Sequence, residues 1–350
     1  MKAGKRKVKR ESSRVSALLL CLALLTGCSP FSGVTVPTTQ TAEDTLPPEE
    51  DIRNLISVGF SQLGAESAWR IANTESIRGA LTKEDGFYLL SDNARQKKEN
   101  QIKAIRSYIS QRVDYIVFAP VTEEGWETVL QEAQIAGIPV IAIDRSIELS
   151  SRHLLTSWIG EDMRQEGEKA GLWLEDYLKE CGRQDDPINI VVLQGTQGSS
   201  AQLGRTIGFD SIADRHDNWN ILEQRDADFT TAKGGEVMET FLKKYHDIDV
   251  VVSQNDDMTA GALEAMDRAG ITTGEGGVTV LSFDSTRAGL QLLKDGRINV
   301  DIECNPLSGP LLADVIHRIE NGEEIEERYY MTENVFTADN VDRYIGHRAY

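Results

Sequence analysis

Short apolar runs alternate with segments of helical period over most of this chain. From about residue 54 to residue 340, runs rich in Val, Ile, Leu and Phe recur at intervals that leave room for one helix between them. Runs of this length and composition predict buried strands. Ten of them are present: Leu55–Phe60, Phe87–Ser91, Tyr115–Ala119, Pro139–Ile143, Leu154–Ile159, Ile188–Leu193, Ile221–Arg225, Val250–Ser253, Val278–Phe283 and Ile298–Ile302.

The segments between these runs predict helices, because their apolar residues recur at three- and four-residue spacing. Gly137, Gly270 and Gly296 each stand between such a segment and the next run, where a left-handed helix end favours glycine. Strand–helix alternation predicts parallel sheets with right-handed crossovers, and ten strands are more than one layer usually holds. We therefore expect an α/β fold with two Rossmann-like lobes. The clearest helical segments are Gln96–Gln111, Gly125–Ala136, Met163–Lys179 and Met258–Ala269.

The first 27 residues resemble a bacterial lipoprotein signal peptide. Seven basic residues lie within the first fourteen positions, and an apolar run of about eleven residues, Val15–Leu25, follows them. Such a run suits a signal-peptide core and is too short to span a bilayer as a mature helix. The sequence Leu-Thr-Gly-Cys at residues 25–28 resembles a lipobox, which predicts cleavage at residue 27 and lipidation of Cys28. The alternative is a cleaved secretory peptide followed by an incidental cysteine.

Residues 28–52 differ in composition from the rest of the chain. They are rich in Ser, Thr, Pro, Gly and acidic residues, including Thr45-Leu-Pro-Pro-Glu-Glu-Asp51. This composition is typical of a flexible tether. Together with lipidation at Cys28, it predicts a domain held outside the cytoplasmic membrane by a lipid anchor.

The net charge argues against one class of partner. The chain has 37 basic and 56 acidic residues, for a formal charge of −19, and removal of the basic signal peptide makes it more acidic still. Nucleic-acid binding depends on clustered Lys and Arg that neutralise phosphates. We therefore expect no nucleic-acid partner.

Cysteine and histidine are too sparse to predict a metal site or a redox site. Beyond the signal peptide and Cys28, the remaining cysteines are Cys181 and Cys304, which are favoured as free thiols over a disulfide. No Cys-x-x-Cys pair is present, and the five histidines are scattered without metal-binding spacing. No metal, cofactor or catalytic residue is predicted.

Polar residues follow the predicted strands. In open parallel sheets, ligands bind outside the carboxyl ends of the strands. Each polar residue alone fits a helix N-cap, but their shared position indicates a binding site. Asp, Asn and Arg side chains can bridge vicinal hydroxyls, and Trp69 and Phe229 offer ring faces to the C–H face of a sugar. These strand-end residues are Ser61-Gln62, Asp92-Asn93, Pro120, Asp144-Arg145, Gln194-Gly195, Asn255-Asp256-Asp257 and Asp284.

Several motifs resemble those of periplasmic sugar-binding proteins of the ribose/galactose type. They include Gly59–Arg70, Lys98–Arg106, Ile143-Asp-Arg-Ser146, Ala227-Asp-Phe-Thr230 and Ser253–Met258. The resemblance extends over about residues 54–340, and Glu66–Arg70 and Phe118-Ala-Pro-Val121 are most similar to galactofuranose-binding members. It implies the type I periplasmic binding protein fold, in which two lobes are joined by three hinge crossings.

The resemblance also implies a set of ligand-binding residues. Asp144 with Arg145 would grip sugar hydroxyls from the first lobe, and Arg205 would reach the ligand from a helix of the second. At the last crossing, Glu303, Cys304 or Asn305 could supply a contact, and Glu303 is taken here. The loop after Phe283 lacks the glycine common in the family, which leaves the sugar open. The full set is Gln62, Glu66, Trp69, Arg70, Asp92, Asp144, Arg145, Arg205, Phe229, Asn255, Asp284 and Glu303.

The family's two-lobed fold implies discontinuous lobes, with crossings near Trp158, Cys304 and Glu333. Residues 53–158 plus 305–332 would form the N-terminal lobe, and residues 159–304 plus 333–350 the C-terminal lobe. The resemblance implies a monomeric, lipid-anchored, extracytoplasmic protein of an ABC sugar importer. Such a protein traps a monosaccharide by hinge closure and delivers it to the permease subunits.

Two other functions use some of the same residues. A carbohydrate-acting enzyme could use Asp144 and Asp284 as an acid–base pair, but the adjacent Arg145 should keep Asp144 ionised. The sequence also has no dinucleotide-binding, P-loop or nucleophile-elbow motif in its expected context. A sugar sensor that presents its ligand to a membrane histidine kinase fits the same residues and stays open.

Overall fold

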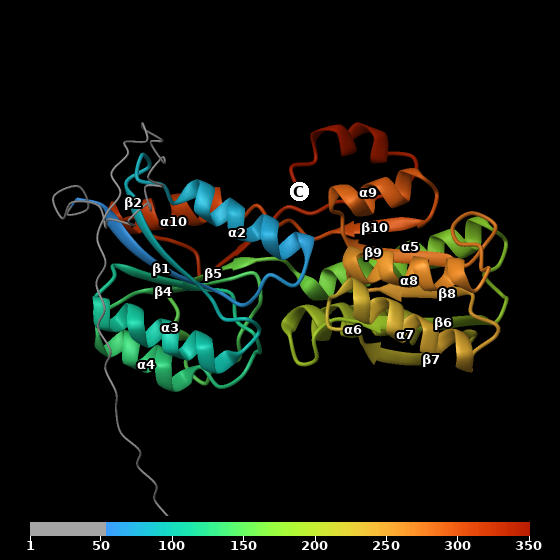
Figure 1. Ribbon diagram of the computed structural model, residues 1–350, viewed down its shortest axis with the longest axis horizontal. Helices are drawn as coiled ribbons and strands as arrows, with labels where there is room; N and C mark the ends of the chain where they lie inside the picture. The colour runs from blue at the N-terminus through green and yellow to red at the C-terminus, as the bar shows by residue number, and fades with distance from the viewer. Residues whose placement is uncertain (1–53) are drawn as a thin grey trace, which may run out of the picture. The chain divides into compact units, whose positions relative to one another are not determined.

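The computed structural model describes residues 54–350 (Figure 1). The predicted signal peptide, the predicted lipidation site at Cys28 and the predicted tether that ends at residue 52 therefore lie outside the described residues. Within the described part of the chain, no helix is long and apolar enough to cross a membrane.

Two six-stranded sheets organise the described chain, and each is the centre of one lobe. The sheet of the N-terminal lobe has the order β11-β5-β4-β3-β1-β2, and all of its strand pairs are parallel. Its strands are β1 (Ile56–Gln62), β2 (Phe87–Asn93), β3 (Tyr115–Phe118), β4 (Val140–Ile143), β5 (Ser157–Gly160) and β11 (Arg328–Tyr330). Its helices are α2 (Ala68–Ala80), α3 (Lys98–Gln111), α4 (Glu127–Ile135), η1 (Arg152–Leu154) and α10 (Gly309–Glu320).

The sheet of the C-terminal lobe has the order β12-β10-β9-β8-β6-β7. Its pairs are parallel except for the short antiparallel pair of β10 and β12. Its strands are β6 (Ile188–Gln194), β7 (Trp219–Asp226), β8 (Val250–Ser253), β9 (Thr279–Asp284), β10 (Val300–Glu303) and β12 (Val335–Phe336). Its helices are α5 (Met163–Glu180), α6 (Ser200–Ala213), α7 (Thr231–Lys244), α8 (Asp256–Arg268), α9 (Arg287–Lys294), η2 (Val341–Arg343) and η3 (Ile345–His347).

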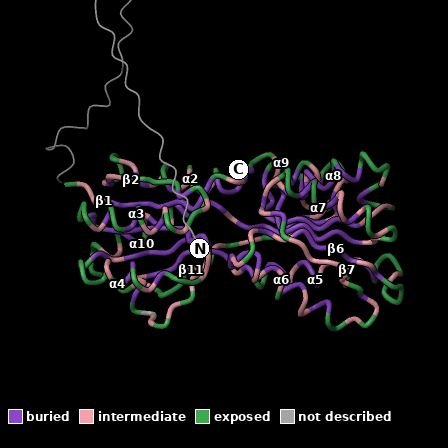
Figure 2. The backbone as a smooth tube through the Cα atoms, turned by 60° about the horizontal axis from the view of Figure 1, so that its bottom comes forward, coloured by how far each residue is buried: buried purple, intermediate pink, exposed green. Residues whose placement is uncertain are grey.

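The central strands are buried on both faces, which explains why they read as continuous apolar runs (Figure 2). In β3, Val117 packs in a cluster with Leu312 of α10, whereas Ile116 and Phe118 pack in a cluster with Leu130 of α4. The same alternation divides the C-terminal lobe into a cluster on the α7 and α8 side and a cluster on the α5 and α6 side. Each lobe therefore has a core on both sides of its sheet.

The α/β fold with two lobes and mostly parallel sheets is confirmed, with local differences from the predicted strands. β5 begins at Ser157 rather than at Leu154, because Arg152–Leu154 forms a 3-10 turn that buries Leu154 in the core of the lobe. Two strands were not predicted. β11 and β12 are only three and two residues long, too short to give a periodic pattern.

Three connections join the two sheets. They run from β5 to α5, from β10 to α10, and from β11 to β12. β5 pairs with β4 through Ile159 and continues to Gly160, two residues beyond the boundary predicted at Trp158. Polar side chains in these connections lie next to the strand ends, where the candidate site is found.

Candidate functional site

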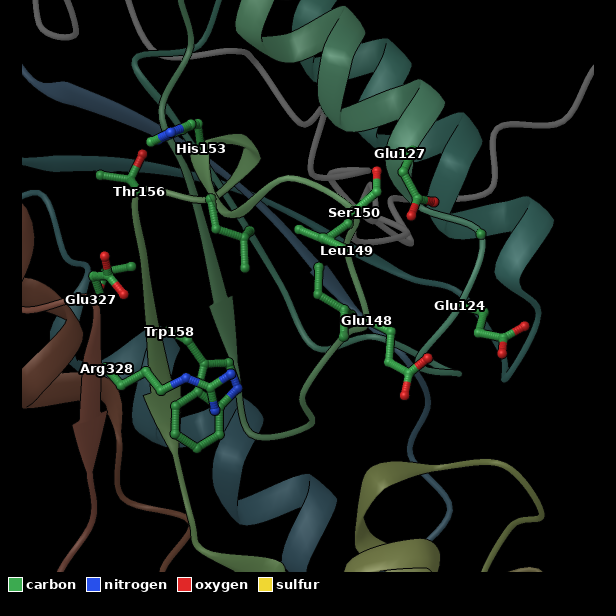
Figure 3. A pocket seen from close by; sticks show the side chains of 14 residues that line it. Glu124, Glu127, Glu148, Leu149, Ser150, His153, Thr156, Trp158, Glu327 and Arg328 are labelled. Atoms are coloured by element: carbon green, nitrogen blue, oxygen red, sulfur yellow. The ribbon is translucent and has the colours of Figure 1, made fainter.

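An open groove on the N-terminal lobe holds none of the predicted ligand residues. It encloses about 880 Å³ beside the start of α4 and the connection from β4 to β5. Figure 3 shows Glu124, Glu127 and Glu148 on one side of this groove, and Trp158 with Arg328 on the other. The predicted residues instead gather at the carboxyl ends of the strands.

A small cavity lies at these strand ends and is lined by residues of both lobes. In this conformation it has room for about one water molecule, roughly 20 Å³. Most of the lining residues are polar or charged, and they are packed closely around this small volume. The residues are Glu66, Ser67, Trp69, Arg70, Asp144, Arg145, Met163, Ala201, Arg205, Phe229, Asn255, Asp284 and Cys304.

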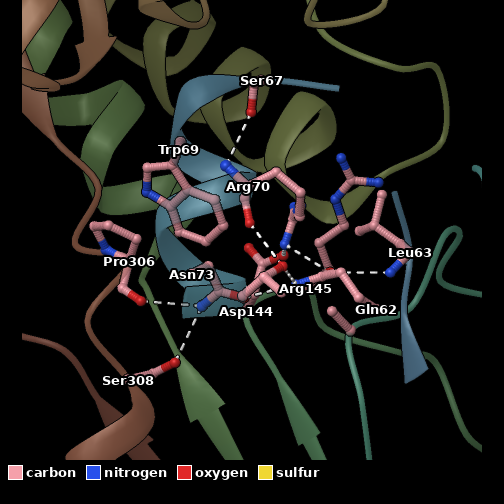
Figure 4. A network of polar contacts seen from close by, with 12 residues as sticks. Gln62, Leu63, Ser67, Trp69, Arg70, Asn73, Asp144, Arg145, Pro306 and Ser308 are labelled. Carbon is pink, nitrogen blue, oxygen red and sulfur yellow. Dashed lines mark hydrogen bonds and ion pairs between the residues drawn. The ribbon is translucent and has the colours of Figure 1, made fainter. Parts of the chain in front are cut away.

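In the N-terminal lobe, Arg70 lies between the carboxylates of Glu66 and Asp144, and Figure 4 shows it beside Asp144. Its Nε donates to Glu66 at 3.0 Å, and its Nη1 donates to Asp144 Oδ2 at 2.6 Å. Ser67 caps α2 by accepting from the Arg70 backbone N–H, which fixes where this arginine leaves the helix. Burial alone would raise the pKa of Glu66, but the charges of Arg70 and Arg145 lower it. This lobe therefore presents an ionised carboxylate beside a fixed guanidinium.

Arg145 differs from Arg70 because it lacks a matching set of partners. Its Nη1 donates to the Val121 carbonyl at 3.2 Å, whereas its Nε has no hydrogen-bond partner within the described chain. Only 2% of this residue is exposed. Burial lowers the pKa of Arg145 to about 10, and the nearby charge of Arg70 acts in the same direction. A buried donor without an acceptor costs free energy, so Arg145 is prepared to bind an acceptor that enters the cavity.

The C-terminal lobe also holds an arginine between two carboxylates, which come from other helices and strands. Arg205 of α6 donates through Nε to Glu166 at 2.6 Å and through Nη2 to Asp284 at 3.2 Å, and it also contacts the Gln254 carbonyl. Burial raises the pKa of Asp284 in spite of Arg205, since Asp256 and Glu166 add negative charge nearby. Asp144 and Asp284 occupy equivalent places, each at the carboxyl end of a strand with positive φ (60° and 98°).

The aromatic side chains of the cavity are held by backbone contacts. Phe229 has a φ of 56°, and its carbonyl accepts from Asn255 Nδ2 at 3.3 Å. A Cβ at Gly195 would overlap the Phe229 ring, so glycine is required there. The guanidinium of Arg145 lies 5.5 Å from the centre of the same ring. Phe229 therefore comes from the C-terminal lobe and contacts an arginine of the other lobe.

Three hydrogen bonds cross directly from one lobe to the other near the cavity. Trp69 Nε1 donates to the Cys304 carbonyl at 2.6 Å. The Ala68 N–H donates to Asp257 Oδ2 at 3.0 Å, and the Ser146 N–H donates to Ser200 Oγ at 2.9 Å. The lobes are therefore in contact beside the cavity, which in this structure has room for about one water molecule.

Nine of the twelve predicted ligand residues line the cavity: Glu66, Trp69, Arg70, Asp144, Arg145, Arg205, Phe229, Asn255 and Asp284. Gln62 lies behind it and bonds to Asn73 and Thr74, which supports the Arg70 side of the site. Asp92 does not reach the cavity, because it is exposed at the end of the edge strand β2.

Glu303 also points away from the cavity. Its Oε2 accepts from Asn334 N–H at 2.9 Å and from Asn334 Nδ2 at 2.6 Å, and its Oε1 accepts from Arg348 and Tyr350 of the C-terminal tail. Cys304, the neighbour that the prediction did not choose, lines the cavity and is a free thiol, as is Cys181. Adjacent residues of an extended segment face opposite sides, which explains why Cys304 lines the cavity and Glu303 does not.

Ser67, Met163 and Ala201 also line the cavity and were not predicted as ligand residues. Met163 and Ala201 lie in the first turns of α5 and α6. An apolar residue in a first turn has the same pattern as a core residue, so no sequence signal distinguishes it. Ser67 could have been found as the N-cap of α2, which follows a strand-end loop.

Comparisons with a family model, with curated proteins and with solved structures all indicate the same family. Residues 58–322 match the model of the periplasmic binding protein domain. The galactofuranose-binding protein of Escherichia coli (strain K12) is 38% identical over 283 residues, which cover 80% of this chain and 86% of that protein. Among solved structures, a protein from Mycobacterium smegmatis in complex with β-D-fucofuranose has a TM-score of 0.80 and 41% identity. The alignment covers 84% of this chain and 95% of that one.

An arabinose-transporter binding protein from Shewanella sp. ANA-3, bound to α- and β-L-arabinofuranose, has a TM-score of 0.79 and 36% identity. It also covers 84% of this chain and 95% of its own. The residues matched by the family model, 58–322, include strands of both lobes and every residue of the cavity. The chain therefore belongs to the periplasmic binding protein family.

Proposed function

We propose that this protein is the lipid-anchored solute-binding component of an ABC sugar importer. It binds a monosaccharide between its two lobes and delivers it, in the closed form, to the permease. Relatives that bind galactofuranose, fucofuranose and arabinofuranose support the sugar class and favour a furanose ring. No chemical step is assigned to the protein.

The observation that carries this proposal is the unpaired donor of Arg145. Its Nε has no hydrogen-bond partner within residues 54–350, and Arg145 lines a cavity that also contains Asp144, Arg70, Asn255 and Asp284. Donors and carboxylates in this arrangement match the vicinal hydroxyls of a sugar, each of which donates and accepts. The rings of Trp69 and Phe229 supply apolar faces in the same cavity.

Hinge closure implies an order in which the sugar binds first and the lobes close afterwards. The present cavity holds about one water, so the sugar binds to separated lobes, and contacts to both lobes then favour a closed form widened around it. A protein that closes on its ligand offers the permease a shape that the empty protein adopts less often.

A thermal-shift panel of pentoses and hexoses, with furanose-rich sugars included, tests the proposal. The native sugar should raise the melting temperature in a concentration-dependent way, because it binds only the folded state. Calorimetry on the best sugar should give one site per chain. A flat response to all sugars would refute the proposed ligand class.

The anchor is tested separately. Cys28→Ser should move the protein from the membrane fraction to the soluble fraction, because lipidation at that cysteine would hold it on the membrane. The matched control is Cys181→Ser, which should leave the protein in the membrane fraction. Membrane association that persists in Cys28→Ser would refute lipidation.

A further inference from the structure

A buried cluster of acidic and thiol groups lies where the three connections between the sheets meet. Glu161 comes from the connection after β5, Cys304 from the one after β10, and Glu333 from the one between β11 and β12. Glu166, in the first turn of α5, completes the group. One ligand atom each of Glu166, Cys304 and Glu333 lie within 4.8 Å of one another.

Several atoms of this cluster have no hydrogen-bond partner within residues 54–350. They are Glu166 Oε1, Glu333 Oε1 and Glu161 Oε2. Glu166 is fully buried, Glu161 is 3% exposed, and the Glu333 side chain is 3% exposed. A buried carboxylate oxygen without a donor or a cation is costly, so each of these atoms indicates a missing partner.

The positive charges next to the cluster do not balance it. Arg205 bonds to Glu166 Oε2, but it also serves Asp284 on the cavity side. Lys169 Nζ lies 3.7 Å from Glu333 Oε2, beyond hydrogen-bond distance. These groups need either bound protons or a bound cation.

The chemistry of the donors favours a particular cation. A thiol sulfur with two carboxylate oxygens is a donor set that suits Zn²⁺, which binds Cys, His and Asp or Glu in four-coordinate sites. Magnesium and calcium prefer oxygen ligands only, and so the thiol argues against them. A water can complete the fourth position, and Glu161 lies near enough to interact electrostatically with Cys304 and Glu333.

We propose that Cys304, Glu166 and Glu333 form a binding site for a divalent cation of the zinc class, with Glu161 as a nearby fourth group. Since Cys304 and Glu333 come from two of the interlobe connections and Glu166 from α5, which follows the third, a bound cation would tie these segments to one another. The site also contacts the sugar cavity, because Glu166 holds Arg205 and Cys304 lines the cavity. Cation binding should therefore alter sugar affinity.

The test uses the full chain with Cys21, Cys28 and Cys181 replaced by serine, so that Cys304 is the only thiol of the four cysteines. Cadmium is the probe, since a Cd²⁺–thiolate bond gives an ultraviolet charge-transfer band that carboxylates alone do not give. One equivalent of Cd²⁺ should produce the band and raise the melting temperature, and Zn²⁺ should compete for the site.

Two variants assign the ligands. Cys304→Ser should abolish the band, and Glu333→Gln should weaken Cd²⁺ binding at least tenfold while the thiol remains. The matched control is Glu324→Gln, which removes an exposed carboxylate near β11 and should leave Cd²⁺ binding unchanged. Absence of a band and of stabilisation with millimolar Cd²⁺ would show that protons neutralise the cluster and would overturn the proposal. An unchanged Cd²⁺ affinity in Glu333→Gln would overturn the ligand set.

Discussion

Each lobe places an arginine between two carboxylates at the cavity, but the lobes differ in the other charged groups near that arginine. Arg70 lies between Glu66 and Asp144 in the N-terminal lobe, and Arg205 lies between Glu166 and Asp284 in the C-terminal lobe. The N-terminal lobe adds a second, unpaired arginine, whereas the C-terminal lobe adds further acidic groups. The N-terminal side of the cavity therefore has two arginines for two carboxylates, whereas acidic groups outnumber the single arginine on the C-terminal side.

This difference indicates that the paired arginines stabilise the cavity wall, whereas Arg145 recognises the ligand. A guanidinium between two carboxylates is already satisfied, so its main effect is to fix the cavity wall. Arg145 has an unsatisfied donor and gains most when a ligand arrives. We expect removal of the paired arginines to damage the fold and removal of Arg145 to damage binding.

The largest expected effect follows from removing a paired arginine. Arg205→Met and Arg70→Met should each lower the free energy of unfolding by about 3–5 kcal/mol, because two buried carboxylates lose their common partner. Arg205→Met should cost more, since further buried acids surround Glu166 and Asp284. Chemical denaturation measures both values.

The matched control for these two variants is Arg106→Met. Arg106 also pairs with a carboxylate, that of Glu132, but the two side chains are 52% and 37% exposed. Its loss should change stability little. If Arg70→Met costs more than Arg205→Met, the C-terminal lobe does not hold the greater excess of buried acid.

The second prediction uses pH to distinguish the lobes. Burial raises the pKa of Asp256, in the C-terminal lobe, to about 6 from an ordinary value of 3.8, although Ser282 and Thr286 donate to it. The folded state then keeps a proton that the unfolded state has released, so stability falls as pH rises from about 4 to about 6. Two pKa units correspond to about 3 kcal/mol.

Glu66 in the N-terminal lobe has the opposite sign. Its lowered pKa contributes stability that is present above its unfolded pKa and is lost as pH falls through the folded value. Asp301 faces Asp256, and its pKa is raised by burial and by the charge of Asp256, so the two carboxyls titrate together. Asp256→Asn should therefore remove at most about 3 kcal/mol of the loss between pH 4 and pH 6, as measured by urea unfolding at several pH values. An unchanged slope would show that Asp256 titrates normally in the folded protein.

The third prediction concerns Arg145, where binding and stability should separate. Arg145→Met should weaken binding of the sugar selected by the panel about 10- to 100-fold, the value of a charge-assisted hydrogen bond. Its free energy of unfolding should change far less than that of Arg205→Met, because only the Val121 carbonyl loses a donor. Calorimetry and denaturation on the same preparation measure the two effects. Retained affinity would remove Arg145 from the proposed ligand contacts.

Most of the fold and much of the cavity could be predicted because both depend on local patterns. Buried strands give apolar runs, and polar residues directly after them, such as Asp144 and Asp284, lie at the sheet edge where ligands bind. Asp92 follows a strand in the same way. It lies outside the cavity because β2 is at the edge of the sheet, and strand order is not visible in the pattern.

The residues that the sequence did not reveal depend on contacts between distant segments. Glu303 binds Arg348 and Tyr350 of the C-terminal tail, and no local pattern relates that tail to β10. Glu161, Glu166 and Glu333 read as ordinary acidic residues of loops and a helix, because their convergence arises only when the three connections meet.

The smallest expected effect tests whether contacts between the lobes contribute to ligand affinity. Trp69→Phe keeps an aromatic ring beside Arg70 but loses the Nε1 donor to the Cys304 carbonyl. One hydrogen bond that stabilises the closed form is worth about 1 kcal/mol, so sugar affinity should fall about threefold to tenfold, mainly through faster dissociation. The matched control is Trp126→Phe, which loses a similar bond to Thr122 inside one lobe. It should lower stability without changing affinity, because that bond is present in open and closed forms alike. Equal affinities for the two variants in stopped-flow and calorimetric measurements would show that the contact between Trp69 and Cys304 does not favour closure, and would leave the arginines and carboxylates of the cavity as the source of it.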